Sequence, residues 1–176
     1  MPQLHCTKKL QKAMGLKKID LVEQELTSSI LGSWHVNLIN IKNCDCVLFV
    51  NNATLFNFLI PDVSKEQFHQ LAQLFRDFLL CVLAEEGIDD VIRASLLKDY
   101  ENISFANTNS KKIIGSMNEL AFMYAYYIEN EGGINTPMLP KIIHQMNRVI
   151  MSSLTAHYPI NALQDLLSLQ IRQLDN

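Results

Sequence analysis

The stretch Ser116-Met-Asn-Glu119, followed by Leu120-Ala-Phe-Met-Tyr-Ala-Tyr-Tyr-Ile128, decides the fold. Its apolar part passes without a charge, although 19% of the chain is charged. Ser116 and Glu119 have the S-x-x-E spacing of a capping box, in which each side chain satisfies a free backbone N–H at a helix start. A helix that is apolar on every side is normally buried on every side. The stretch therefore predicts a central buried helix over 116–129, with the rest of the chain packed around it.

Three stretches before this helix are predicted to be β-strands, the first from its alternation and the second from its β-branched and aromatic residues. They cover residues 34–41, 46–50 and 54–60, and turn signals at Asn43 and Asn51-Asn52 separate them. Short turns between neighbouring strands predict an antiparallel β-meander. Two further strands are expected at Pro2–Thr7 and at Ile103–Ala106.

Helical periodicity and caps predict the remaining helices. Thr7 is the expected N-cap of Lys8–Leu16, which Gly15 ends in the usual C-cap role. Ser64-x-x-Gln67 forms a second capping box before a long amphipathic helix. This helix is predicted over Lys65–Glu86, and another over Asp89–Tyr100. Thr136-Pro137 opens a further predicted helix, whose inward residues are Ile142, Ile143, Met146 and Val149. The last predicted helix is Ile160–Leu174, whose inward residues are Leu163, Leu166, Leu167 and Ile171.

The order of elements predicts one α+β domain over residues 1–176, with an antiparallel sheet packed against several helices. The segment Asp20–Ser33 is left undecided, since Leu21, Val22 and Leu26 suggest only a weak helical turn or a surface segment. His144, Asn147 and Arg148 lie off the apolar stripe of their helix, so we expect them to be solvated.

Composition limits the classes of function. The net charge of −3 argues against a mainly electrostatic nucleic-acid binder, because such proteins usually carry a basic excess. A basic patch in the first eighteen residues keeps that class open, although charge runs are more often solvated helix faces. The lysines of this patch are Lys8, Lys9, Lys12, Lys17 and Lys18.

The chain shows no secretory signal and no apolar run of the roughly 20 residues that a membrane helix needs. Its four cysteines do not have the pattern of a disulfide framework. We therefore expect a reduced, cytoplasmic protein without a membrane span.

Several phrases along the chain resemble a family of small bacterial proteins that is classed only as a domain of unknown function. The resemblance implies a stand-alone bacterial cytoplasmic protein and carries no activity; the segment Asp20–Ile30 takes no part in it. The phrases are His5-Cys-Thr-Lys-Lys-Leu10, Trp34-x-x-Asn37, Leu48-Phe-Val-Asn51 with Thr54-Leu-Phe56, Thr108-Asn-Ser110, Gly115-Ser-Met-Asn118, Leu120-Ala121 and Tyr158-Pro-Ile160.

The best candidate site is the polar cluster Asn107–Lys112, just before the central helix. Free N–H groups at a helix start, beside the side chains of Thr108, Asn109, Ser110 and Lys111, suit a phosphate or a carboxylate. The plainer interpretation is that these residues only turn the chain and cap the helix, as Asn, Ser and Thr do routinely. Asn118 is counted with the candidate ligand-binding residues.

A second group of candidates lies on the predicted sheet. His35 and Asn37 share the strand face opposite Trp34, so an imidazole and an amide can line a pocket there, unless that face is simply the outer, polar side of the sheet. His5 and Cys6 point to opposite faces of their strand, so His5 cannot activate Cys6, which we expect to be a small core residue.

No metal or cofactor is expected. Cys44-Asp-Cys46 lacks the usual zinc spacing and a second cysteine pair.

The sequence predicts a non-catalytic binding or regulatory module that acts through a protein partner or a small anionic ligand. One alternative is a small enzyme on a phosphorylated or acyl substrate, with Asn109, Ser110 and Lys111 positioning the anion and His5 or His35 as acid or base. This alternative requires His5 or His35, Asn37 and Asn109 to converge in one pocket. A nucleic-acid-associated factor is a third alternative, and a homo-oligomer is left open.

Overall fold

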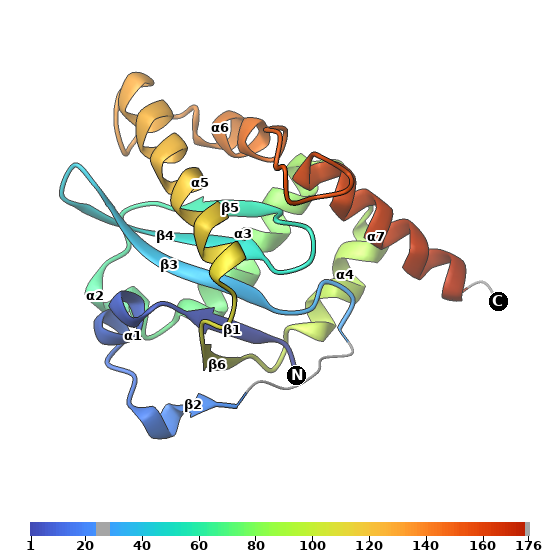
Figure 1. Ribbon diagram of the computed structural model, residues 1–176, viewed down its shortest axis with the longest axis horizontal. Helices are drawn as coiled ribbons and strands as arrows, with labels where there is room; N and C mark the ends of the chain where they lie inside the picture. Colours follow the sequence, from blue (N-terminus) through green and yellow to red (C-terminus); the bar gives the residue numbers. More distant parts are fainter. Residues whose placement is uncertain (24–28, 175–176) are drawn as a thin grey trace.

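The computed structural model describes residues 1–23 and 29–174, with side chains described up to residue 169. A six-stranded sheet has the strand order β2-β6-β1-β3-β4-β5 (Figure 1). The strands are β1 Gln3–Cys6, β2 Leu21–Val22, β3 Trp34–Ile41, β4 Cys44–Asn51, β5 Asn57–Ile60 and β6 Ser104–Asn107. The α+β class predicted from the sequence is therefore confirmed.

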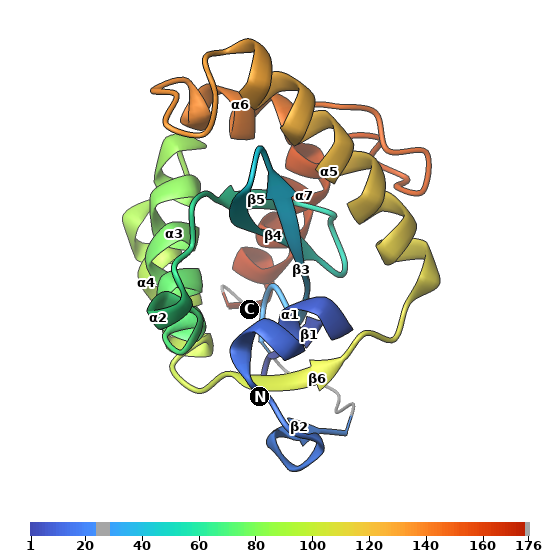
Figure 2. The ribbon, with the colours of Figure 1, turned by 90° about the vertical axis from the view of Figure 1, so that its left-hand side faces the viewer.

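Helices cover both faces of the sheet. Figure 2 shows α2, α3 and α4 on one side and α5 on the other, with α6 spanning the β5 edge between them. The helices are α1 Lys8–Met14, α2 Lys65–Phe68, α3 Leu71–Glu85, α4 Asp90–Asp99, α5 Lys111–Asn130, α6 Leu139–Met146 and α7 Pro159–Leu174, with a 3-10 turn at Lys18–Asp20. No helix in the part of the chain described here is long and apolar enough to cross a membrane.

The predicted meander is confirmed. β3, β4 and β5 pair antiparallel, with Trp34 opposite Asn51 and Leu48 opposite Leu59. Lys42 and Asn43 turn the chain between β3 and β4 with positive φ angles of 46° and 68°, the backbone conformation that a tight hairpin requires.

The sheet is mixed, which corrects the expectation of an antiparallel sheet. β1 runs parallel to both β3 and β6, and β2 runs parallel to β6. The strands predicted at 2–7 and 103–106 exist as β1 and β6, whereas β2 was not predicted. Alternation along one short strand does not reveal a partner that lies far away in the sequence. Within the undecided segment, residues 24–28, including Leu26, lie outside the described residues.

The central helix differs from its prediction in two ways. α5 begins at Lys111, because Ser110 is the N-cap and its hydroxyl accepts a hydrogen bond from the N–H of Ile113 at 3.3 Å. Ser116 and Glu119 therefore lie inside the helix and form no capping box. The helix is also buried along one stripe only, Met117, Leu120, Tyr124 and Ile128, while Phe122 is 76% exposed and Tyr126 is 59% exposed.

The other helices follow their predictions with shifted ends. Gly15 ends α1 in the left-handed conformation, and the Ser64–Gln67 capping box is present. The predicted helix Lys65–Glu86 is divided into α2 and α3 by residues 69 and 70. The helix expected from Thr136-Pro137 begins at Leu139, with Pro140 in its first turn. In α7, Leu163 and Leu167 are buried as predicted; the side chain of Ile171 lies outside the described residues.

The sheet face toward α3 and α4 carries an aromatic core. Phe75 of α3 contacts the rings of Trp34, Phe49, Phe58 and Tyr100 at centroid distances of 5.2–5.9 Å. The indole N–H of Trp34 donates to the hydroxyl of Tyr100 at 2.8 Å, and that hydroxyl donates to the carbonyl of Gly32 at 2.8 Å. Both buried polar groups are thus satisfied, as burial requires.

The opposite face and the β5 edge depend on Asn147, the residue that follows α6. Its side-chain oxygen accepts from the backbone N–H of Asn57 at 2.9 Å, and its amide donates to the carbonyl of Asn57 at 2.8 Å. Tyr124 of α5 donates from its hydroxyl to the side-chain oxygen of Asn57 at 2.8 Å. Asn147 is fully buried, so the expectation that it is solvated is wrong. An amide side chain can replace a peptide group on a strand edge. A prediction based only on the apolar stripe of the helix does not detect this role.

We expect Asn147→Ala to lower the free energy of unfolding by about 3 kcal/mol, because it leaves a buried N–H and a buried C=O of Asn57 without partners. Urea unfolding followed by circular dichroism measures this change. The same substitution at the exposed Asn130, whose amide donates only to the carbonyl of Tyr126, serves as the matched control and should cost less than about 0.5 kcal/mol. Equal effects of the two substitutions would contradict the role assigned to Asn147.

Candidate functional site

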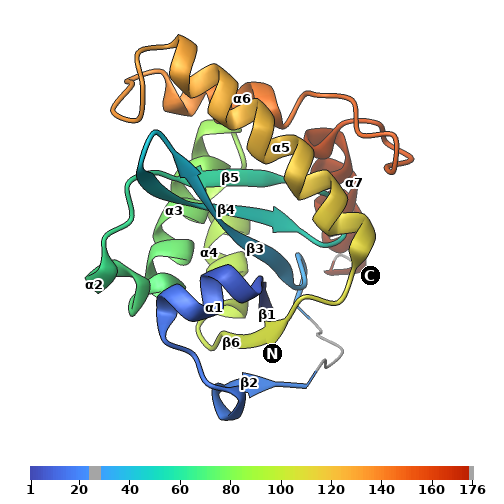
Figure 3. The same cartoon turned by 60° about the vertical axis from the view of Figure 1, so that its left-hand side comes forward.

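The candidate site lies at the carboxyl ends of β1 and β6. These two parallel strands end side by side, with Cys6 paired to Asn107. The chain continues from β1 into α1 and from β6 into α5 (Figure 3). The polar residues of both connections therefore gather at one end of the sheet, which is the usual location of ligand sites next to parallel strands.

Two histidines from neighbouring strands stack on each other at this end. His5 of β1 pairs with His35 of β3, and their rings lie 5.0 Å apart at an interplanar angle of 17°. Nδ1 of His5 lies 2.8 Å from the carbonyl oxygen of Asn107. A carbonyl only accepts, so Nδ1 carries the proton and Nε2 has a free lone pair.

His35 has the same tautomer. Its Nε2 accepts from the backbone N–H of Asn109 at 3.4 Å, so Nδ1 carries the proton and donates to the side-chain oxygen of Asn52 at 2.7 Å. The loop before α5 is thereby attached to the histidine pair.

Both histidines are held in the neutral form. The pKa of His35 is lowered to about 4, mainly by burial; the hydrogen bond to Asn52 opposes this shift and the nearby His5 adds to it. Burial also lowers the pKa of His5, against the effect of the hydrogen bond to Asn107. Two neutral rings can stack without charge repulsion, so the pair is stable at neutral pH.

The side chain of Asn107 links the two connections. Its oxygen accepts from Nζ of Lys8 at 2.8 Å and from the amide of Gln11 at 3.2 Å, and Gln11 also donates to the carbonyl of Cys6 at 2.7 Å. The hydroxyl of Thr7 donates to the side-chain oxygen of Asn37 at 2.9 Å. Thr7 therefore precedes α1 as predicted but makes no side-chain cap bond.

A hollow of about 420 Å³ lies between the β2 segment and the end of β6 with the loop after it. Neither histidine lines it, but His5 hydrogen-bonds to the backbone of Asn107 in its wall. Ala106 in its wall is the β6 partner of His5, and directly opposed residues share a sheet face. Lys18 and Glu23 contribute one charge of each sign. The lining residues are Lys18, Leu21, Val22, Glu23, Ala106, Asn107, Thr108 and Asn109.

The structure brings together some of the residues that the sequence singled out. His5, His35, Thr108 and Asn109 lie at this end of the sheet, and Asn37 joins them through Thr7. Of the candidate residues only Thr108 and Asn109 line the hollow; His5, His35 and Asn37 do not, and neither do the three others. Ser110 caps α5, Lys111 begins that helix with an exposed side chain, and Asn118 is exposed two helical turns further on.

Sequence reasoning missed several members of the site. Asn52 was assigned only to a turn, and Gln11 was not considered. Lys8 and Lys18 were noted only as part of a basic patch. The sequence pattern that could have revealed the site is the presence of polar residues directly after each of two strands. This pattern predicts a shared site only if β1 and β6 are known to be neighbours in the sheet.

Cysteine chemistry does not contribute to this site. Cys6 is fully buried in the core, as predicted, and burial raises the pKa of its thiol to about 12. Cys46 is also buried, and burial raises the pKa of its thiol to about 11. Within residues 1–23 and 29–174, no three His, Cys, Asp or Glu side chains are grouped as a metal site would require.

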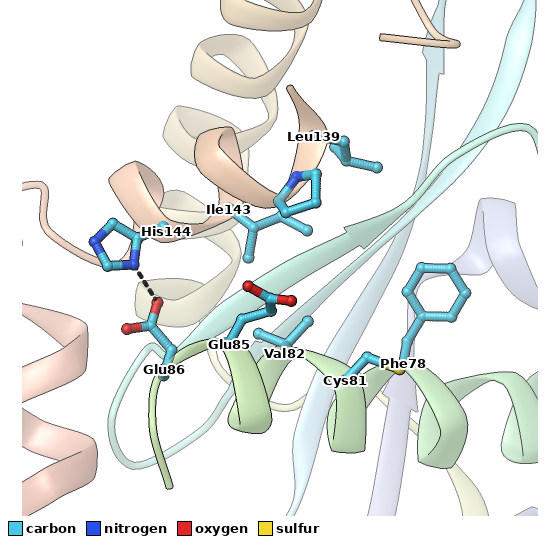
Figure 4. Close-up of a pocket in the computed structure, with 9 residues that line it drawn as sticks. Phe78, Cys81, Val82, Glu85, Glu86, Leu139, Ile143 and His144 are labelled. Atoms are coloured by element: carbon cyan, nitrogen blue, oxygen red, sulfur yellow. Dashed lines mark ion pairs between the residues drawn. The ribbon is translucent and has the colours of Figure 1, made fainter. Parts of the chain in front are cut away.

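A smaller hollow of about 150 Å³ lies between α3 and α6 (Figure 4). Glu86 points from the end of α3 toward His144, 3.2 Å from its Nδ1, and accepts two hydrogen bonds from Arg148 at 2.7 and 3.0 Å. The Glu86 side chain is only 1% exposed. His144 and Arg148 are exposed, as expected, and both also contact the buried Glu86.

Comparison with known proteins shows the family. The model of a domain of unknown function, DUF6933, matches residues 3–162, and the chain belongs to this family. Comparison with curated proteins gave no significant match. The resemblance stated from the sequence phrases, to a family classed as a domain of unknown function, is confirmed.

We expect His35 to titrate near pH 4 in the folded protein, measured by NMR from its ring protons. The unfolded chain takes up this proton first, near its ordinary pKa of 6.5. The contribution of His35 to stability is therefore complete above pH 6.5 and is lost as the pH falls toward 4. A folded-state pKa at or above 6.5 would contradict the buried, neutral pair.

Proposed function

We propose that the protein is a binding module for a small anionic ligand, held in the hollow at the carboxyl ends of β1 and β6. The observation that carries the proposal is the convergence of the His5–His35 pair, the Asn107–Asn109 loop and the hollow at one end of the sheet. A bacterial, cytoplasmic setting is part of the proposal.

Positive charge supports an anionic group in the ligand. Lys18 lines the hollow and Lys8 contacts Asn107 at its wall. Among the described residues, neither lysine lies in an ion pair. The first N–H groups of α5, which have no partners within the helix, begin directly after Asn109 and Ser110. Among the described residues of the lining, Glu23 is the one with an acidic side chain, and it favours a ligand that also carries a donor group.

Two unused acceptors belong to residues that do not line the hollow but hydrogen-bond to the backbone of residues that do. Nε2 of His5 makes no hydrogen bond within the described part of the chain, and its proton-free state is fixed by the bond from Nδ1 to Asn107. The side-chain oxygen of Gln3 is buried without a hydrogen-bond partner, although the same amide donates to the carbonyl of Glu23 at 2.8 Å. An acceptor in a buried site is satisfied by an N–H or O–H donor. A ligand that carries a hydroxyl or amine as well as an anionic group fits both requirements.

A titration with glycerol 3-phosphate tests the two requirements together, with inorganic phosphate and glycerol as partial probes. We expect NMR shifts of the amides of Thr108 and Asn109, and weaker binding of each partial probe. Lys18→Gln should weaken binding roughly tenfold, the value of one charge-assisted hydrogen bond. Lys65→Gln, an exposed lysine on α2, is the matched control and should change nothing. Shifts that are absent, or that lie away from the hollow, would refute the site.

An enzyme on a phosphorylated or acyl substrate is the second candidate function, and the tautomer of His5 favours it. A neutral imidazole with one nitrogen oriented by a carbonyl and a free lone pair on the other is suited to act as a general base. His35 is less suited, because the N–H of Asn109 occupies its lone pair. In this case His5→Gln would abolish turnover, whereas a binding module has no turnover to lose.

A nucleic-acid-associated function is the third candidate, through the exposed lysines of α1 and the following turn. It requires binding that collapses as salt is added, because counterions are released from the phosphates. The position of Lys8 and Lys18 beside a small hollow favours the small ligand instead.

A further inference from the structure

The outward side of α5 carries a continuous stripe that no described element covers. At 3.6 residues per turn, its members fall within an arc of about 80°. This arc lies opposite the stripe that is buried against the sheet. Figure 3 shows α5 running across the outside of the sheet with its outer side open. The outer stripe of α5 consists of Lys111, Gly115, Asn118, Phe122, Tyr126 and Glu129.

The middle of the outer stripe is apolar to an unusual degree. Phe122 is 76% exposed and Tyr126 is 59% exposed, and residues four apart are neighbours on a helix surface. Isolated exposed apolar residues are normal, but a pair of neighbouring aromatic residues is the kind of anchor that protein interfaces use. These two side chains are not needed for the core, because Leu120, Tyr124 and Ile128 fill the sheet side of the same helix.

The charges at the two ends of the stripe identify the partner. Lys111 lies at the N-terminal end and Glu129 at the C-terminal end, the reverse of what the helix dipole favours. A second α5 in antiparallel orientation, with the two-fold axis near residue 120, would place Lys111 of each copy opposite Glu129 of the other. The same register sets Phe122 opposite Asn118.

Gly115 supports this register. In the antiparallel arrangement Tyr126 of one copy lies over Gly115 of the other. The space above Gly115 is open: a Cβ added there would meet no atom within 4 Å. A residue without a side chain opposite an aromatic ring allows the two helices to approach closely.

We infer that the partner of this surface is a second copy of the chain, joined through an antiparallel, two-fold pairing of α5 helices. Such an interface is self-complementary, as two-fold symmetry requires. The aromatic pair supplies the buried apolar area, and the exposed charge pairs set orientation and register. Among the described residues, Glu129 forms an ion pair with Lys42 alone, at 3.8 Å between Nζ and Oε2, and both side chains are exposed. Glu129 is therefore available to the second copy.

Sedimentation velocity over a micromolar concentration series tests the inference. We expect the wild-type protein to form a dimer, and Phe122→Glu to raise the dimer dissociation constant more than about tenfold. Tyr126→Glu should act in the same direction. Val91→Glu, at a side chain of α4 that is 77% exposed, is the matched control and should leave the dimer unchanged.

Charge reversal distinguishes this interface from any other. Lys111→Glu and Glu129→Lys should each weaken the dimer roughly fivefold, the range of an exposed ion pair. The double variant should restore it, since opposite charges face each other again. Circular dichroism confirms that each variant is folded. A wild-type monomer at every concentration, a dimer that Phe122→Glu leaves intact, or a double variant no better than the single ones would overturn the inference.

Discussion

The structure depends on the buried contact between Asn147 and the edge strand β5. An edge strand exposes unpaired backbone groups, and proteins must cover or pair them. Here the side-chain amide of Asn147 takes the place of a further strand, by pairing with both backbone groups of Asn57. The side chain of Asn57 in turn holds Tyr124, and with it the middle of α5, against the sheet. One amide therefore closes the sheet edge and connects it to two helices.

The position of α5 determines the candidate site. Tyr124 lies fourteen residues from the N-cap Ser110, about 21 Å along the helix, so anchoring the helix at Tyr124 directs its start toward the other end of the sheet. There the N–H of Asn109 meets His35, and the carbonyl of Asn107 meets His5. Two histidines are buried as neutral rings in a place where apolar residues would pack more simply. Titratable groups whose pKa is strongly shifted by burial are enriched at functional sites.

The sequence was sufficient for the local features and insufficient for the long-range ones. The meander could be predicted because alternation, Asn turns and Pro61 all lie within residues 34–61. The stacking of His5 on His35 could not, because it follows from the parallel pairing of β1 with β3, whose partners are thirty residues apart. Asn147 was misjudged because its amide acts as a peptide group. The uncharged run of α5 was misjudged because two of its aromatic residues face solvent.

The most direct test of the ligand site is native mass spectrometry of the protein after incubation with a small-molecule extract of the cells that express it. The account predicts a discrete extra mass that is lost on denaturation, belongs to a compound with an anionic group and a hydroxyl or amine, and is absent from Lys18→Gln. The Lys65→Gln control should retain it. A protein that captures nothing from the extract, or a bound mass that Lys18→Gln retains in full, would contradict the account.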